Sequence, residues 1–156
     1  MGWGSILSTL LGALIGVFST LAADWSRAIR DRRANDQDVR RQTYADYLAA
    51  LAQTRNLLRL AARSRSTPLE ERARNAMEAF REGSAYELRY QIALVAPTAV
   101  VDASTAAFRA LRDLRDLVEE GATHTEQDYL VLRDHWESCF AELRAAMKSD
   151  LTGVRP

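Results

Sequence analysis

Few side chains in this sequence have both the type and the spacing that catalysis or metal binding requires. Its two histidines, His124 and His135, and its single cysteine, Cys139, are the main candidates besides many carboxylates. A di-iron helical bundle needs Glu-x-x-His pairs, and no glutamate here precedes a histidine by three residues. Asp134 and Glu137 flank His135, but residues this close along a helix point to different faces. We therefore predict no metal site.

The sequence also lacks the motifs that activate a nucleophile or cradle a phosphate. No GxSxG motif, P-loop or dinucleotide-binding fingerprint occurs. Cys139 stands beside Phe140 in a helical pattern, which favours a small packing residue over a nucleophile. We expect no catalytic residue and no cofactor, and an enzyme with an unrecognised site remains the alternative.

The elements that would position any site are predicted to be helices. The chain has 156 residues with only 3 prolines and 7 glycines, and it is rich in Ala, Leu, Arg and Glu. This length fits one domain, or a small domain with an anchor. The 21 basic side chains balance the 21 acidic ones, so a general nucleic-acid binder is not expected. One cysteine excludes an internal disulfide.

Residues 3–23 carry no charge and are predicted to form a transmembrane helix. In helical form this segment extends about 31 Å, which matches a hydrocarbon core of roughly 30 Å. Trp3 and Trp25 stand at its two ends, where indole rings favour the membrane interface. A cleaved signal peptide would need a basic start, which Met1 and Gly2 do not supply. A signal peptide and a helix buried in a soluble assembly are the alternatives.

Small residues recur every four positions on one side of the predicted span. A face of this kind lets two helices approach closely in a bilayer, as in GxxxG pairs. We therefore predict a homo-oligomer formed through the span. A spacing without a role and a hydroxyl-lined path between several copies are the alternatives. The residues predicted to mediate this association are Gly4, Ser8, Gly12, Gly16 and Thr20.

A basic juxtamembrane segment, residues 26–41, follows the predicted span. Positive charge on this side predicts a single pass through the inner (cytoplasmic) membrane, with the N-terminus outside and the remaining chain in the cytoplasm. The segment is also expected to touch anionic lipid headgroups, and a solvated helix face is the alternative. The residues predicted to contact lipid are Arg27, Arg30, Arg32 and Arg33.

Beyond residue 41, apolar residues recur with the period of a helix. Tyr44 and Tyr47 are expected to place their rings in the core and their hydroxyls in water. His135 is expected to be exposed or half-buried, and His124 to lie in a loop near a helix start. The residues predicted to line the core are Tyr44, Tyr47, Leu48, Leu51, Leu58, Leu69, Ala73, Met77, Phe80, Leu88, Ile92, Val95, Val101, Ala107, Phe108, Leu111, Leu114, Val118, Leu130, Trp136, Phe140, Leu143, Met147 and Leu151.

Capping signals divide this pattern into four helices. Gly121 predicts a helix end, and Gly83 with Ser84 predicts a bend. The helix starts are predicted by Thr67 as N-cap with Pro68 and Glu70, by Thr98 after Pro97, and by the capping box of Thr123 with Glu126.

The predicted fold is all-α, with the transmembrane helix followed by an up-down-up-down four-helix bundle. Helices of about 23 to 28 residues with short connections pack antiparallel to their neighbours. The first bundle helix is expected to run on from the span, because no Pro or Gly falls between Arg27 and Leu60. The predicted domains are the span at 1–25, the juxtamembrane segment at 26–41 and the bundle at 42–156.

The first third of the chain resembles a loose group of uncharacterised single-pass membrane proteins from high-GC bacteria. The resemblance rests on the span up to Trp25, on "RDRR", and on "RRQTYADYLAAL" from Arg40 to Leu51. It implies the same order of span, Arg-rich stretch and small helical bundle. The group has no assigned activity, so the resemblance implies no site residues.

These observations favour a membrane-anchored interaction or scaffold module. Its span would associate with other copies, and one face of its bundle would bind an unknown cytoplasmic protein. An oligomeric pore-forming or membrane-disrupting effector is the alternative, and an enzyme is the third hypothesis. The expected partners are the lipid bilayer, further copies of the chain and a cytoplasmic protein, with no nucleic acid.

Overall fold

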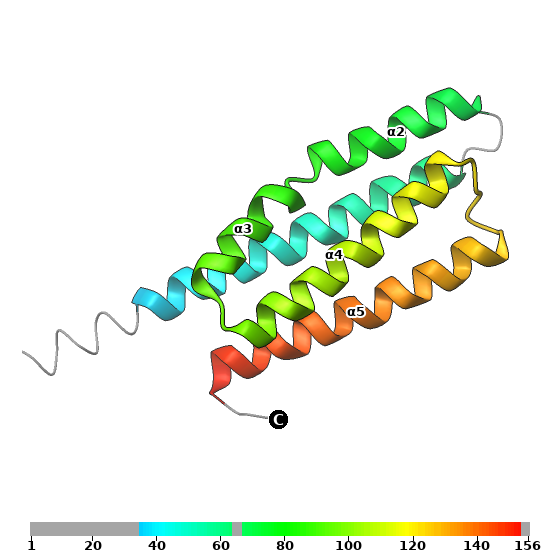
Figure 1. Cartoon of the computed structure of the whole chain (residues 1–156). Coiled ribbons are helices and arrows are strands. Elements are labelled where there is room, and N and C mark those ends of the chain that lie inside the picture. Colours follow the sequence, from blue (N-terminus) through cyan, green and yellow to red (C-terminus); the bar gives the residue numbers. More distant parts are fainter. Residues whose placement is uncertain (1–34, 64–66, 154–156) are drawn as a thin grey trace, which may run out of the picture. The chain divides into compact units, whose positions relative to one another are not determined.

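The computed structural model describes residues 35–63 and 67–153, and this part of the chain is all-helical (Figure 1). Residues 40–156 belong to one compact unit, to which the following description applies. A first helix covers residues 35–63. It is followed by α2 (Leu69–Glu82), α3 (Ala85–Val95), α4 (Thr98–Glu119) and α5 (Gln127–Thr152).

The predicted up-down-up-down order of the bundle is confirmed. The chain runs along the 35–63 helix, returns along α2 and α3, runs forward along α4 and returns along α5 (Figure 1). α4 packs against α2, α3 and α5. The second leg of the bundle differs from the prediction, because it consists of two helices of 14 and 11 residues instead of one bent helix.

Gly83 and Ser84 separate α2 from α3. A Cβ atom on Gly83 would collide with Thr54 Oγ1 of the 35–63 helix, so only glycine allows this close approach. The turn out of α2 then falls on Ser84, which adopts the left-handed conformation with φ 51°. That conformation costs an L-residue roughly 1–2 kcal/mol. The second leg of the bundle is therefore interrupted at this point. The contact with Thr54 requires glycine at position 83, and the left-handed turn follows at Ser84.

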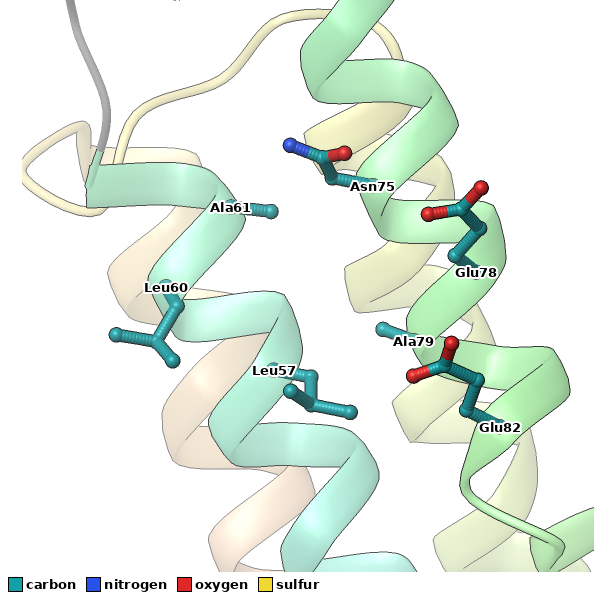
Figure 2. Close-up of a pocket in the computed structure, with 7 residues that line it drawn as sticks. All are labelled: Leu57, Leu60, Ala61, Asn75, Glu78, Ala79 and Glu82. Atoms are coloured by element: carbon teal, nitrogen blue, oxygen red, sulfur yellow. The ribbon is translucent and has the colours of Figure 1, made fainter.

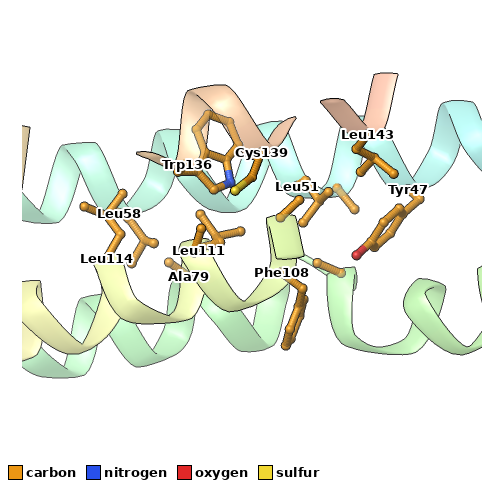
Figure 3. Close-up of a cluster of buried hydrophobic side chains, with 14 of the residues drawn as sticks. Tyr47, Leu51, Leu58, Ala79, Phe108, Leu111, Leu114, Trp136, Cys139 and Leu143 are labelled. Atoms are coloured by element: carbon orange, nitrogen blue, oxygen red, sulfur yellow. The ribbon is translucent and has the colours of Figure 1, made fainter. Parts of the chain in front are cut away.

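The core is built from side chains that recur at intervals of three or four residues along the long helices. Coiled-coil-like bundles pack in this way, with each buried side chain inserted between those of a facing helix. Figure 3 shows several of these buried side chains in the space between the helices. The series is Tyr44, Tyr47, Leu51, Thr54, Leu58 and Ala61 on the 35–63 helix, Val100, Ser104, Ala107, Leu111, Leu114 and Val118 on α4, and Trp136, Cys139, Leu143 and Met147 on α5.

The predicted buried face of α2 is wrong for two residues. Leu69 and Met77 are 54% and 57% exposed, and the buried positions are instead Arg72, Ala76 and Ala79. Two alanines on this face leave room for neighbouring helices to approach. Arg72 is buried because its guanidinium donates hydrogen bonds to the backbone carbonyls of Gly121 and Thr67. Phe80 packs against the core as predicted, but the fully buried positions of α2 are small residues and one hydrogen-bonded arginine, which do not follow an apolar stripe.

Gly121 ends α4 as predicted. It adopts φ 108°, its N–H donates to the carbonyl of Val118, and the N–H of Ala122 donates to the carbonyl of Leu117. This pair of bonds is the Schellman motif, in which glycine takes the left-handed position after the helix.

The predicted helix starts are displaced. α2 begins at Leu69 with Pro68 as its N-cap, and Pro97 takes the N-cap position before Thr98. The carboxylate of Glu126 accepts hydrogen bonds from the N–H and hydroxyl of Thr123, as in a capping box. α5 begins at Gln127, after both residues. The hydrogen bonds between Thr123 and Glu126 therefore stabilise the turn that precedes α5 and not its first helical turn.

No helix within residues 35–63 and 67–153 is long and apolar enough to cross a membrane. The predicted span and the predicted lipid contacts lie outside the described residues. This applies to Gly4, Ser8, Gly12, Gly16 and Thr20, and to Arg27, Arg30, Arg32 and Arg33.

Candidate interaction site

A groove runs between the 35–63 helix and α2, and it is the candidate functional site (Figure 2). Its volume is about 270 Å³. Pockets for small-molecule ligands usually measure roughly 300–1,000 Å³, so this groove suits a few inserted side chains better than a cofactor. The lining residues are Leu57, Leu60 and Ala61 of the 35–63 helix, and Asn75, Glu78, Ala79 and Glu82 of α2.

The 35–63 helix supplies an apolar wall. Leu57 and Ala61 point toward α2, whereas the side chain of Leu60, which also lines the groove, extends from the 35–63 helix on the side away from α2 (Figure 2). Leu57 is half-buried against the core, whereas Leu60 is 57% exposed. Leu60 falls outside the three-and-four spacing of the core series, so core packing does not account for it. An exposed leucine beside a groove offers apolar area to a partner.

α2 supplies a polar and acidic wall. The side chains of Asn75 and Glu82 point toward the 35–63 helix, with Ala79 at the same level between the helices (Figure 2). Neither Glu78 nor Glu82 makes an ion pair with another residue that the structure describes. Like charges four residues apart destabilise a helix by about 0.2–0.5 kcal/mol. Arg74, four residues before Glu78, and Arg81, three residues after it, offset part of this repulsion within α2.

Thr54 and Gly83 bring the two helices into close contact next to the groove. Gly83 follows Glu82 directly, and Thr54 lies one turn before Leu57. Thr54 is fully buried, and its hydroxyl has no hydrogen-bond partner among the described residues. The groove is thus built on a contact that only glycine permits, which fixes the spacing of its two walls.

A second group of exposed apolar residues lies on α3. Tyr86, Tyr90 and Leu94 recur every four residues and are 51%, 52% and 86% exposed. The Tyr86 ring lies 6.2 Å from that of Phe108, and the Arg89 guanidinium lies 5.0 Å above the Phe108 ring. These contacts attach α3 to α4 through a tilted aromatic pair and a cation–π contact.

The residues singled out for chemistry are not brought together as a catalytic group. His135 is exposed, as expected, and its Nε2 lies 3.8 Å from the sulfur of Cys139. Cys139 is buried, and this burial raises the pKa of its thiol, so the sulfur is a weak nucleophile. His124 lies in the turn before α5, where its backbone N–H donates a hydrogen bond to the backbone carbonyl of Ala62.

Tyr44 and Tyr47 differ from the prediction that their hydroxyls reach water. The Tyr44 hydroxyl donates to Asp150 over 2.7 Å, and the Tyr47 hydroxyl bonds with Ser104 over 3.1 Å. Arg40 also pairs with Asp150 at 3.4 Å. Burial raises the pKa of both tyrosines, so both are neutral hydrogen-bonding groups that join the 35–63 helix to α4 and α5.

No group of three or more histidine, cysteine or acidic side chains within the described ranges is placed to hold a metal ion. The chain was also compared with known proteins. No protein-family model matches it. Neither the curated proteins nor the solved structures contain a significant match.

The groove residues were not singled out from the sequence, although two signals for them are present. Glu78 and Glu82 are like charges at helical spacing, and Leu60 is a leucine outside the buried series. Neither signal identifies a groove alone, because the partner wall comes from a helix some 20 residues away along the chain. Only the packing of the 35–63 helix against α2 brings the two signals together.

Proposed function

We propose that this chain is a membrane-anchored helical interaction module whose bundle binds a cytoplasmic protein in the groove between the 35–63 helix and α2. The observation that carries the proposal is the groove itself, with an exposed leucine among its lining residues and, on α2, two carboxylates that make no ion pair with a described residue. Apolar anchors with a polar rim are the usual anatomy of a protein-binding surface. The proposal includes no enzymatic activity.

The membrane part of the proposal is supported by the sequence. An uncharged stretch long enough for a bilayer lies between Trp3 and Trp25, and arginines follow it. The same order of features occurs in the single-pass proteins that the first third of the chain resembles. We assign the span to the inner membrane with the bundle in the cytoplasm, and self-association to the small-residue face of the span.

Self-association is tested by the mass of the full-length protein in nanodiscs. Replacing Gly12 and Gly16 with isoleucine should convert a dimer to a monomer, because bulky side chains prevent close approach of the helices. A larger closed assembly would favour the pore-forming alternative instead. A monomer before and after substitution would contradict the proposed role of the span.

The groove is tested by the size of the complexes that the full-length protein forms in membranes of its own host. Leu60→Asp and Glu82→Arg should each shift the complex to the mass of the protein without its partner. Val131→Asp and Glu142→Arg are matched controls, because they make the same changes at exposed positions on α5. A complex that survives both groove substitutions would overturn the assignment of this surface.

A further inference from the structure

We infer that the occupant of the groove is a basic amphipathic helix, with arginine or lysine side chains one turn apart on Glu78 and Glu82 and apolar side chains on Leu57 and Leu60. This inference rests on the proposed function, because it names the chemistry of the partner that the groove binds. The groove, the charge on α2 and the exposed apolar wall carry it together.

Charge complementarity selects a cationic partner. Neither glutamate makes an ion pair with a described residue, although Arg74 and Arg81 of the same helix stand four residues before and three residues after Glu78. Glu78 and Glu82 both lie in the second half of α2, where the helix dipole adds partial negative charge to theirs. A nucleic acid or another polyanion is repelled by this wall, whereas a guanidinium or ammonium group relieves the repulsion between the two carboxylates.

The two walls favour a helix over an extended strand. The apolar and the acidic residues lie on neighbouring helices, so the partner must present apolar and basic side chains on adjacent faces. Successive side chains of a strand point to opposite faces, which separates the two kinds of group. On a helix, residues three and four apart lie side by side, so one amphipathic segment supplies both.

The spacing of the carboxylates sets the register of the partner. Four residues along α2 correspond to about 6 Å of axial rise. A partner helix lying along α2 repeats its own side chains at the same interval, so two basic residues at i and i+4 meet Glu78 and Glu82 together. Apolar residues at i+3 and i+7 of that helix then lie on the side of Leu57 and Leu60.

The inference is tested by the binding of a designed peptide to the full-length protein in zwitterionic nanodiscs, which do not themselves attract cations. The peptide is an 18-residue helix with leucine at i+3 and i+7 and arginine at i and i+4, and binding is measured by fluorescence anisotropy. Glu78→Gln with Glu82→Gln should weaken binding about tenfold, and added salt should weaken binding to the unsubstituted protein. Leu60→Ala should also weaken it.

Two controls separate recognition from nonspecific attraction. Glu87→Gln with Glu142→Gln removes the same charge from α3 and α5, away from the groove, and should leave binding unchanged. Glu78→Lys with Glu82→Lys should reverse the preference, so that a peptide with glutamate in place of arginine binds better. Glutamine keeps the size and helix propensity of glutamate, and circular dichroism checks that this variant remains folded.

Three outcomes would overturn the inference. One is equal binding by the groove and control variants. Another is no binding of the basic peptide although Leu60→Asp abolishes the host complex; the proposed function would then stand with a partner of different chemistry. The third is tighter binding by a peptide of residues 26–41, which would make a second copy of this chain the occupant. Failure of both the peptide and the host-complex assay would overturn the proposed function as well.

Discussion

At the scale of single residues, the region around Gly83 shows how packing overrides local conformational preference. Glycine is the residue best suited to the left-handed conformation, yet Gly83 has φ −70° and Ser84 takes the left-handed position. Gly83 is needed where it stands, because a side chain there would collide with Thr54. The contact between the 35–63 helix and α2, and with it the groove, depends on this one missing Cβ.

Gly83→Ala should lower the free energy of unfolding by about 1–3 kcal/mol, because the added methyl group overpacks the contact with Thr54. Urea denaturation of the full-length protein measures the loss. Thr54→Ala combined with Gly83→Ala should recover part of it, because the second substitution removes the hydroxyl that collides. Strictly additive losses in the double variant would show that the two residues are not in contact.

The buried tyrosines predict sensitivity to alkaline pH. Burial raises the pKa of Tyr47 and Tyr129 above their ordinary value of 10.0, so the folded protein keeps phenolic protons that the unfolded chain loses. Their contribution is complete below about pH 10 and is lost as the pH rises toward their folded-state pKa values. The stability of the fold should therefore decline above about pH 10.

Tyr129→Phe tests this origin of the alkaline decline, because the Tyr129 hydroxyl has no hydrogen-bond partner among the described residues. The free energy of unfolding of the variant should fall less steeply with rising pH than that of the unsubstituted protein. The difference in slope should be up to about 1.4 kcal/mol per pH unit. Urea midpoints measured at several alkaline pH values give the slopes. Identical slopes for the two proteins would exclude Tyr129 as a source of the decline.

At the scale of helices, the sequence was informative wherever large apolar residues form the core. The apolar pattern predicts that five leucines are buried, and the structure confirms this for Leu51, Leu58, Leu111, Leu114 and Leu143. On α2 the same criterion holds for Phe80, which packs against Phe108, but it fails for Leu69 and Met77, because the fully buried positions are alanines and Arg72, which carry no apolar periodicity. The groove was not predictable because it joins residues of two helices whose separation depends on Gly83.

The two sides of α3 should respond differently to substitution. Ile92→Ala should lower the free energy of unfolding by about 2–5 kcal/mol, because it leaves a cavity beside α4. Leu94→Gln should change it by less than about 0.5 kcal/mol, because this side chain is 86% exposed. Thermal unfolding followed by circular dichroism measures both. A large loss from Leu94→Gln would mean that another part of the protein covers this face.

At the scale of the whole molecule, the proposed module combines an anchor with a binding groove. A membrane anchor holds several copies at high local concentration, so a groove of modest size can act without high intrinsic affinity. The described residues include the bundle and its groove, while the predicted span and its arginines precede them. The anchor is thus a prediction from the sequence, and the structure describes the surface that such an anchor would present.

Site-specific photo-crosslinking in host membranes tests the central claim most directly, because it reports contact at one chosen position whatever protein binds there. A photoreactive residue replaces Leu60 at the groove, and in a separate variant it replaces Val131, which is similarly exposed on α5. We expect a discrete crosslinked product from position 60 and none of that mass from position 131. Equal labelling from both positions, or no product from position 60, would contradict the claim that this groove is where the protein binds its partner.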